Sequence, residues 1–305
     1  MRKLANDIYQ RVTDGLIAAL ESGVMPWRRD WALGNGGEWG MPHNAVSGRE
    51  YRGINLMILI GEQVEKGYTS TGWITPKKAI ENELNFKGQK CTEVIFWKRM
   101  SKKDADTGEN STFMFARSYR VLNLDQCEGD KSKLKGHKAL EIPEDLENMD
   151  ALVPAIEKGL GLKVRHGGDR AYYSPDQDFI GMPPKDAFKT ESGYRGTFLH
   201  ESTHATGHKS RCDRQFGARF GTEAYAFEEL VAEIGCCFLQ ATLNIDMDTE
   251  NHASYLENWL KVLKDDKRAI FTAASKAQAA CDYILDAIEI KELPDYSDNQ
   301  KQEAA

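Results

Sequence analysis

One five-residue segment, HESTH at residues 200–204, constrains this chain more than any other. Residues four apart lie on the same face of a helix, so His200 and His204 can direct two imidazoles at one ion. Glu201, beside the first histidine, can accept a proton from a water molecule that the ion activates. The spacing therefore predicts a helix that carries a catalytic metal site, with Glu201 as the general base.

Such a site needs a third protein ligand, and the sequence offers three routes to it. The extended pattern HExxHxxGxxH fails, because Ser210 stands where the third histidine would be. His208 follows His204 by four residues, but Gly207 between them is expected to end or turn the helix. The third route is a glutamate on the next helix, in the segment FEELVAEIG.

Helical geometry chooses among the glutamates of that segment. The apolar stripe of the predicted helix consists of Phe227, Leu230, Val231, Ile234 and Phe238. Glu229 and Glu233 flank this stripe and can face inward, whereas Glu228 is expected on the solvent side. We therefore predict Glu229 as the third ligand and Glu233 as a carboxylate that orients a ligand histidine. One divalent ion is expected, with zinc favoured and manganese or cobalt also suited to the ligand set.

At 305 residues, the chain is long enough for two domains that each bury a core of their own. It has no apolar run of about 18 residues or more, so we expect neither a membrane-spanning segment nor a membrane partner. The first residues predict an amphipathic helix rather than a signal peptide. The six cysteines lack CxxC spacing and are expected to be reduced thiols of a cytoplasmic protein.

The distribution of elements predicts an α+β protein with domains at residues 1–130 and 151–290. A polar segment at 131–150 indicates a linker, and residues 291–305 indicate a flexible tail. The first domain should be mixed, and its expected elements are helices at 4–22 and 54–66, a strand leading to a helix at Pro76, and paired strands in CTEVIFWKR and TFMFARSYRVLNL.

The second domain is expected to be rich in helices. A helix near 150–160 and two short strands should precede the motif helix, and three helices should follow it. An edge strand around Tyr173 to Met182 could align an extended peptide beside the metal site. Adjacent Cys236 and Cys237 point to different helix faces, so we expect small core residues rather than metal ligands.

Aromatic and basic side chains alternate through the first hundred residues in a way that suits single-stranded nucleic acid. Bases stack on aromatic rings while cations follow the phosphates. The candidate contacts are Trp27, Arg28, Arg29, Trp31, Asn44, Tyr51, Arg52, Asn55, Trp73 and Lys98. Trp27 and Trp73 could equally be packing anchors, and Asn44 and Asn55 could equally cap turns.

Charge places any such site in the first domain. Residues 1–130 hold 18 Lys and Arg against 17 Asp and Glu, whereas the remaining residues hold 22 against 30. An acidic surface is a poor partner for phosphates, so the second domain is not expected to bind nucleic acid. The near-neutral first domain must use a local groove.

Several blocks together resemble ArdC-type antirestriction proteins of conjugative plasmids. They include NAVSGREYRGIN, GWITPKKA, AYYSPDQDFIGMPP, FLHESTHATGHKSR and YAFEELVAEIG, and the resemblance spans roughly residues 5–288. It implies a domain that binds single-stranded DNA joined to a zincin-like metallopeptidase domain, and protection of incoming plasmid DNA from restriction. It also supports His200, His204 and Glu229 as ligands and Glu201 as the base.

Two functions remain open at this point. In the first, DNA tethers a metallopeptidase that cleaves a protein such as a restriction enzyme or a DNA-bound protein. In the second, the protein shields single-stranded DNA without proteolysis, and the metal mainly stabilises the second domain. A nuclease is disfavoured, because such enzymes usually use carboxylate-rich or paired-metal sites.

Overall fold

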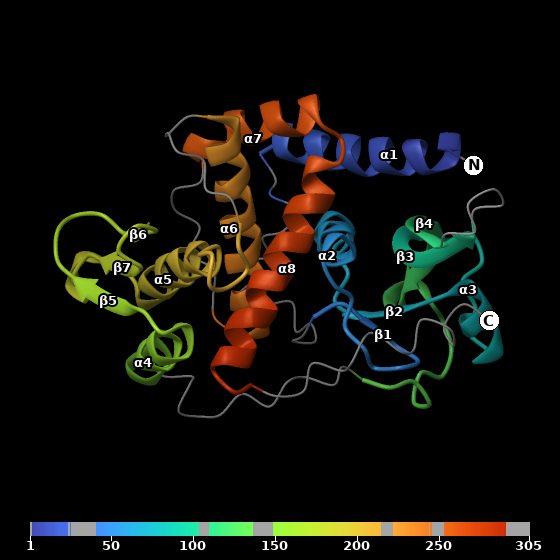
Figure 1. Cartoon of the computed structure of the whole chain (residues 1–305). Helices are drawn as coiled ribbons and strands as arrows, with labels where there is room; N and C mark the ends of the chain where they lie inside the picture. Colours follow the sequence, from blue (N-terminus) through green and yellow to red (C-terminus); the bar gives the residue numbers. More distant parts are fainter. Residues whose placement is uncertain are drawn as a thin grey trace.

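The computed structural model describes residues 2–23, 25, 41–103, 110–136, 149–214, 222–243, 245 and 253–290. It has the predicted α+β class, with a four-stranded sheet in the first half of the chain and a three-stranded sheet in the second (Figure 1). None of the helices in these ranges combines the length and apolar character that a bilayer-spanning segment needs.

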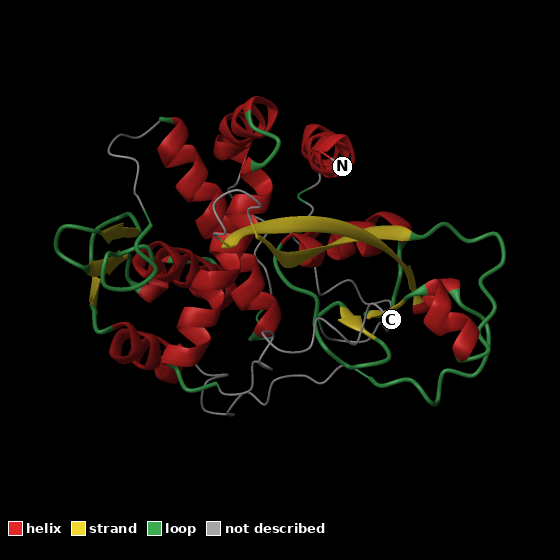
Figure 2. Ribbon diagram, turned by 45° about the vertical axis from the view of Figure 1, so that its right-hand side comes forward, coloured by secondary structure: helices red, strands yellow, loops and turns green. Residues whose placement is uncertain are grey.

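The first half builds its sheet in the order β1-β2-β4-β3, with β1 parallel to β2 and the other pairs antiparallel. Its two long strands form the expected hairpin, which Figure 2 shows as a long curved ribbon. The elements are α1 (Arg2–Glu21), β1 (His43–Asn44), α2 (Ile54–Lys66), β2 (Gly72–Ile74), α3 (Pro76–Glu81), β3 (Thr92–Lys103), β4 (Asn110–Asn123) and the 3-10 turn η1 (Leu124–Gln126).

The second half has a small sheet in the order β5-β7-β6 and five helices among its described residues. The elements are α4 (Met149–Leu160), β5 (Lys163–His166), β6 (Tyr172–Ser174), β7 (Phe179–Met182), the 3-10 turn η3 (Lys185–Ala187), α5 (Glu191–Thr206), α6 (Glu223–Thr242), α7 (Ala253–Asp265) and α8 (Ala269–Ala287). The sheet thus has three strands where two were expected.

The edge strand of that sheet is shorter than predicted. β7 lies in the middle of the sheet, parallel to β5 and antiparallel to β6, so Phe179–Met182 is not an edge. The edges are β5 and β6. The prediction of one edge strand from Tyr173 to Met182 was wrong, because alternating apolar residues do not distinguish a central strand from an edge strand.

Threonine caps begin both helices that carry the predicted metal ligands. Thr190 accepts a hydrogen bond from the Gly193 N–H before α5, and Thr222 accepts one from the Tyr225 N–H before α6. Such caps satisfy N–H groups that have no partner within the helix. Both helices therefore begin at defined residues, which fixes the rotation of their side chains.

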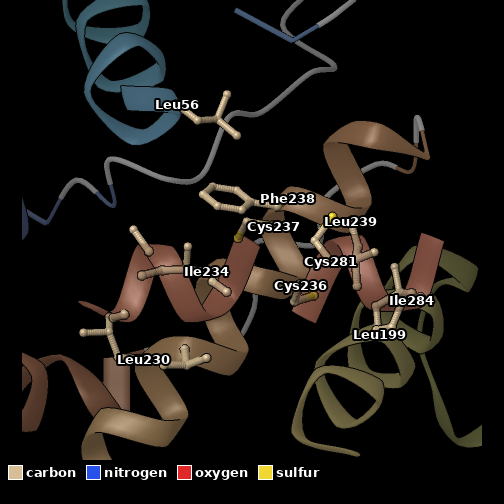
Figure 3. Packing of buried hydrophobic residues seen from close by; sticks show 14 of the residues in the cluster. Leu56, Leu199, Leu230, Ile234, Cys236, Cys237, Phe238, Leu239, Cys281 and Ile284 are labelled. Carbon is tan, nitrogen blue, oxygen red and sulfur yellow. The ribbon is translucent and has the colours of Figure 1, made fainter. Parts of the chain in front are cut away.

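The main hydrophobic core lies between α5, α6 and α8. Figure 3 shows Leu199 of α5, Ile234 of α6 and Ile284 of α8 in this cluster. Cys236 and Cys237 are buried in it as free thiols, as expected for core residues. The same cluster continues through Ile8, Leu16 and Leu20 of α1 and Leu56 of α2, so the two halves share one core.

Polar contacts also join the halves. Arg52 forms an ion pair with Asp282 of α8, and the neighbouring Gly53 N–H donates to Gln278 Oε1. Thr13 of α1 donates to the carbonyl oxygen of Lys267. Two smaller clusters, around Ile74 and around Trp73, lie beside the first sheet and do not cross the junction. The main core is therefore shared by the two halves, unlike the two separate cores that we expected. Among the described residues, only the first half has smaller clusters of its own.

The predicted linker is partly structured. Leu134 packs on the cluster around Ile74, and the Lys135 N–H donates to the carbonyl oxygen of Ala45. Residues 131–136 thus lie against the first half of the chain, and α4 begins at Met149. Residues 137–148 and the predicted tail 291–305 lie outside the described residues.

Candidate metal centre

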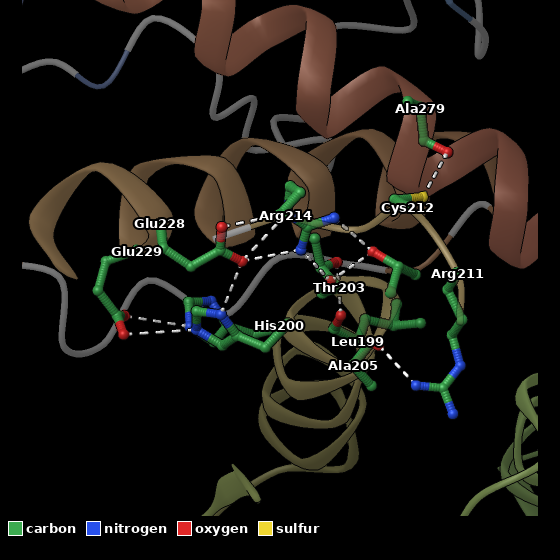
Figure 4. Close-up of polar contacts among 12 residues, drawn as sticks. Leu199, His200, Thr203, Ala205, Arg211, Cys212, Arg214, Glu228, Glu229 and Ala279 are labelled. Atoms are coloured by element: carbon green, nitrogen blue, oxygen red, sulfur yellow. Dashed lines mark hydrogen bonds and ion pairs between the residues drawn. The ribbon is translucent and has the colours of Figure 1, made fainter. Parts of the chain in front are cut away.

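The three predicted metal ligands come together between α5 and α6. His200, His204 and Glu229 each offer one ligand atom, and these atoms lie within 4.8 Å of one another. Figure 4 shows the His200 imidazole facing the Glu229 carboxylate. The Nε2 atom of His200 lies 3.4 Å from Glu229 Oε2, and Nε2 of His204 lies 3.4 Å from Glu229 Oε1.

These separations fit a divalent ion. An ion with bonds of about 2.0–2.1 Å and tetrahedral geometry holds neighbouring ligand atoms about 3.3–3.4 Å apart. Both histidines present Nε2 to Glu229, and two histidines at i and i+4 on one helix face can share one ion. Two histidines and one carboxylate therefore form a ligand set that suits a zincin-type metal site.

Glu201 lies on the same helix, directly after the first ligand. Its side chain is largely buried, and its negative charge contributes to raising the pKa of His204. It is therefore close to the ligand histidines without belonging to the ligand set. A carboxylate beside the ligand histidines is a candidate to accept a proton from a water molecule in the site.

The prediction that Glu228 faces solvent was wrong. Glu228 is only 4% exposed, and its Oε1 lies 3.3 Å from Nδ1 of His204. Arg214 donates to the same carboxylate from Nε and from Nη2. The apolar stripe of α6 misled the prediction, because a buried carboxylate with its own cation can occupy a position that an isolated one cannot.

The other two neighbouring candidates lie close to the site but outside the ligand set. Glu233 Oε2 lies 3.8 Å from Nδ1 of His200, on the side of the ring that faces away from Glu229. His208, the weaker third-ligand candidate, hydrogen-bonds to the Ser210 hydroxyl at 2.7 Å instead.

His204 and the carboxylate of Glu229 shift each other's pKa. Burial lowers the pKa of His204, but hydrogen bonds to Glu228 and Glu229 outweigh it and raise this pKa to about 10. Burial raises the pKa of Glu229, but hydrogen bonds from His200 and His204 hold it far below its ordinary value. A metal ligand histidine must be neutral at the coordinating nitrogen, so metal binding would release a proton from His204.

Five of the candidate DNA contacts lie in described parts of the chain, and each of them has a packing or hydrogen-bonding role within the fold. Trp73 is fully buried, and Tyr51 packs in the same small cluster. Asn55 is buried, donating to the carbonyl oxygen of Ile95 and accepting from its N–H. Asn44 accepts hydrogen bonds from Val46 N–H and Ser47 N–H, which is the turn-capping alternative. Arg52 pairs with Asp282.

The remaining candidates cannot be placed in the same way. Trp27, Arg28, Arg29 and Trp31 lie outside the described residues. Lys98 belongs to β3, the first strand of the hairpin.

The hairpin carries a group of aromatic and basic side chains of which Arg117 and Tyr119 were not selected from the sequence. Phe96 of β3 and Tyr119 of β4 are partly exposed, with ring centroids 5.0 Å apart. The guanidinium of Arg117 lies 5.3 Å from the Tyr119 ring centroid. Alternation along the two paired strands was the available signal, since residues at i and i+2 share one face of a sheet.

Family models match both halves of the chain. The N-terminal domain of anti-restriction factor ArdC matches residues 6–122, and a zincin-like metallopeptidase matches residues 149–276. The chain belongs to the ArdC family of antirestriction proteins. The metal-free crystal structure of the antirestriction ArdC protein from plasmid R388 has a TM-score of 0.76 and 39% sequence identity, covering 92% of this chain and 98% of that chain.

Other relatives agree with this assignment. The Mn(II)-bound structure of the R388 protein has a TM-score of 0.75, with 37% identity, 92% of this chain and 98% of that chain covered. The uncharacterized protein y4eC of Sinorhizobium fredii (strain NBRC 101917 / NGR234) is 36% identical over 91% of each chain. Two DNA primases TraC of Escherichia coli are 32% and 34% identical over 100% and 93% of this chain, which spans only 29% and 20% of their lengths.

Proposed function

We propose that this ArdC-family chain is a metal-dependent peptidase whose first half binds single-stranded DNA. The observation that carries the peptidase is the convergence of both Nε2 atoms on the Glu229 carboxylate, with Glu201 beside them on α5. Zinc is the metal that we propose for the His2Glu set. When bound, the metal would supply Lewis acidity toward a peptide carbonyl and a water molecule.

The chain's own residues supply the proton transfers. Glu201 accepts the proton of the attacking water and then donates it to the departing amine, as a general base that becomes a general acid. His200, His204 and Glu229 hold the metal. The reaction class is therefore peptide hydrolysis.

An extended peptide can be aligned by the edge of the small sheet. β6 is an edge strand that lies against α5, and its Tyr172 side chain is 49% exposed. Tyr173 is held in place by donating to Asp178, which binds Arg211 of the segment after α5. The outer edge of β6 in the described sheet can add a peptide as a further strand, which gives affinity through main-chain hydrogen bonds.

Single-stranded DNA binding is proposed for the hairpin face that carries Phe96, Arg117 and Tyr119. Phe96 and Tyr119 are partly exposed while packing on the cluster around Trp73. Partly exposed rings beside a cation suit base stacking and phosphate contact, at about 1–3 kcal/mol per stacked base. The biological role that follows is protection of incoming plasmid DNA during conjugation, with a restriction enzyme or another DNA-bound protein as the substrate.

The experiment compares wild-type protein and Glu201→Ala, both loaded with Zn(II), on casein with and without single-stranded DNA. Cleavage by the wild type alone supports the peptidase, and stimulation by DNA supports coupling between the halves. If Glu201→Ala still protects DNA from restriction as well as the wild type does, shielding without proteolysis replaces this proposal. Phe96→Ala and Tyr119→Ala should each weaken single-stranded DNA binding in fluorescence anisotropy, whereas the exposed-residue control Ile80→Ala should not.

A further inference from the structure

The segment after α5 folds back onto the helix that carries the two histidines. The Cys212 N–H donates to the carbonyl oxygen of Thr206, and the Arg214 N–H donates to that of Gly207. Asp213 adopts a left-handed conformation, with φ of 47°, where the chain reverses. This fold-back brings Arg214 beside the last turn of α5, next to the metal site.

Arg214 is buried and uses its whole guanidinium fork. Its Nη1 donates to Thr206 Oγ1 at 2.7 Å, and its Nη2 donates to the carbonyl oxygen of Thr203 at 2.6 Å. Nε and Nη2 also donate to the Glu228 carboxylate, at 3.1 and 2.8 Å. A planar fork can bind a carboxylate and two further acceptors in a fixed orientation, whereas a lysine ammonium provides only a point charge.

The carboxylate held in this way contacts a metal ligand. Glu228 Oε1 accepts from Nδ1 of His204, while Nε2 of the same ring faces Glu229. The hydrogen bond at one ring nitrogen fixes both the tautomer and the direction of the other nitrogen. Figure 4 shows Arg214 beside the Glu228 carboxylate, with dashed lines marking their hydrogen bonds.

We infer that Arg214 is a positioning residue that acts through Glu228 to aim His204 at the metal, and so sets the metal affinity of the site. The inference rests on the metal site of the proposed function. Loss of such an outer contact typically weakens metal binding by about 10–100-fold.

Arg211 provides a matched control in the same segment. Its side chain is as buried as that of Arg214, at 3% exposure for each. It also binds a carboxylate with two nitrogens, Nη1 and Nη2 to Asp178, and donates to the carbonyl oxygen of Ala205 near the end of α5. Its carboxylate partner, however, accepts from the Tyr173 hydroxyl rather than from a histidine.

The test measures the Zn(II) affinity of the full chain by competition with a chromophoric chelator. The variants are Arg214→Lys, Glu228→Gln, their combination, and Arg211→Lys, each first shown to be folded by circular dichroism in EDTA. Arg214→Lys and Glu228→Gln should each bind Zn(II) about 10–100-fold more weakly. The Zn(II) affinity of the double variant should equal that of the single variant that binds Zn(II) less tightly, because both changes break the same chain of contacts.

The control separates positioning from stability. Arg211→Lys should unfold at a lower temperature and still bind Zn(II) within about twofold of the wild type. The Co(II) absorption spectrum should change in Arg214→Lys and Glu228→Gln but not in Arg211→Lys. If Arg214→Lys does not fold, Thr206→Val replaces it as the test variant, because it removes the hydrogen-bond acceptor of Arg214 Nη1. Thr206→Val should also lower the Zn(II) affinity.

Two failures are distinguishable. If the wild type binds Zn(II) and the folded Arg214 and Glu228 variants bind it equally well with an unchanged Co(II) spectrum, the positioning role is wrong. If the wild type binds neither Zn(II), Mn(II) nor Co(II), the metal site itself is wrong and the inference falls with it.

Discussion

Gly235 of α6 lies directly against Thr203 of α5, with no room for a side chain at the glycine. A Cβ atom on Gly235 would lie 2.6 Å from Thr203 Cγ2, which is shorter than any normal contact. Thr203 precedes His204 on α5, and Gly235 lies two residues after Glu233 on α6. The missing side chain at Gly235 therefore allows α5 to bring its histidines within reach of Glu229.

Gly235→Ala should separate the helices. Overpacking of this kind costs about 1–3 kcal/mol, and the shift should also weaken Zn(II) binding because Glu229 moves with α6. Gly196→Ala is the control, since its Cβ would meet only the flexible Gln240 Nε2 at 3.2 Å. Thermal unfolding in EDTA and a Zn(II) titration check both effects. Equal stability of the two variants would contradict this account of the contact.

Metal binding should stabilise the chain by mass action. A metal at one hundred times its dissociation constant adds about 2.7 kcal/mol to the free energy of unfolding, and Zn(II) or Mn(II) should therefore raise Tm by several degrees. Glu229→Ala should abolish this increase because it removes a ligand. Glu201→Ala should keep it, and differential scanning fluorimetry with and without EDTA measures all three proteins. Loss of the increase in Glu201→Ala would assign Glu201 to the ligand set.

Asp178 should make stability depend on pH at the acidic end. Burial raises its pKa, but hydrogen bonds from Arg211 and Tyr173 outweigh burial and hold the pKa below the ordinary value of 3.8. A lowered pKa stabilises the fold above the ordinary value, and this stabilisation is lost as pH falls through the lowered one. Asp178→Asn should therefore cost about 1–3 kcal/mol at pH 7 and progressively less below pH of about 4. Urea unfolding in EDTA at several pH values tests it, and a difference that does not shrink at low pH contradicts it.

The grouping of the three predicted ligands could be inferred from the sequence because they lie on two consecutive helices. His200 and His204 are one helical turn apart, and Glu229 lies on the helix that follows. The contacts that orient them were not accessible in the same way. Arg214 comes from an irregular segment that folds back through tertiary hydrogen bonds, and such a segment has no periodic pattern to interpret.

The candidate DNA contacts had a different difficulty. Composition identifies aromatic and basic side chains but not their exposure, and Trp73 and Asn55 are both buried. Asn55 joins α2 to the edge of β3 through both the N–H and the carbonyl of Ile95, a pairing between residues 40 positions apart. The shared core was missed for the same reason, because α1 and α2 pack on helices from the far end of the chain.

Arg52 is the predicted phosphate contact whose surroundings now argue most clearly for another role. Its guanidinium pairs with Asp282, and the adjacent Gly53 N–H donates to Gln278 Oε1, so it joins α2 to α8. We expect Arg52→Ala and Asp282→Ala each to lower the free energy of unfolding by about 1–2 kcal/mol. The double variant should be as stable as the less stable single variant, because both changes remove the same ion pair.

The same variants should leave DNA binding nearly unchanged. A lost phosphate contact on a single strand would reduce the slope of log affinity against log salt by about 0.7, and we expect no such change in Arg52→Ala. Fluorescence anisotropy with single-stranded DNA at several salt concentrations measures the slope. A reduction in Arg52→Ala that is absent from Asp282→Ala would show that Arg52 leaves its carboxylate partner to bind phosphate. Equal slopes in both variants would instead establish Arg52 as a residue that holds the two halves of the chain together.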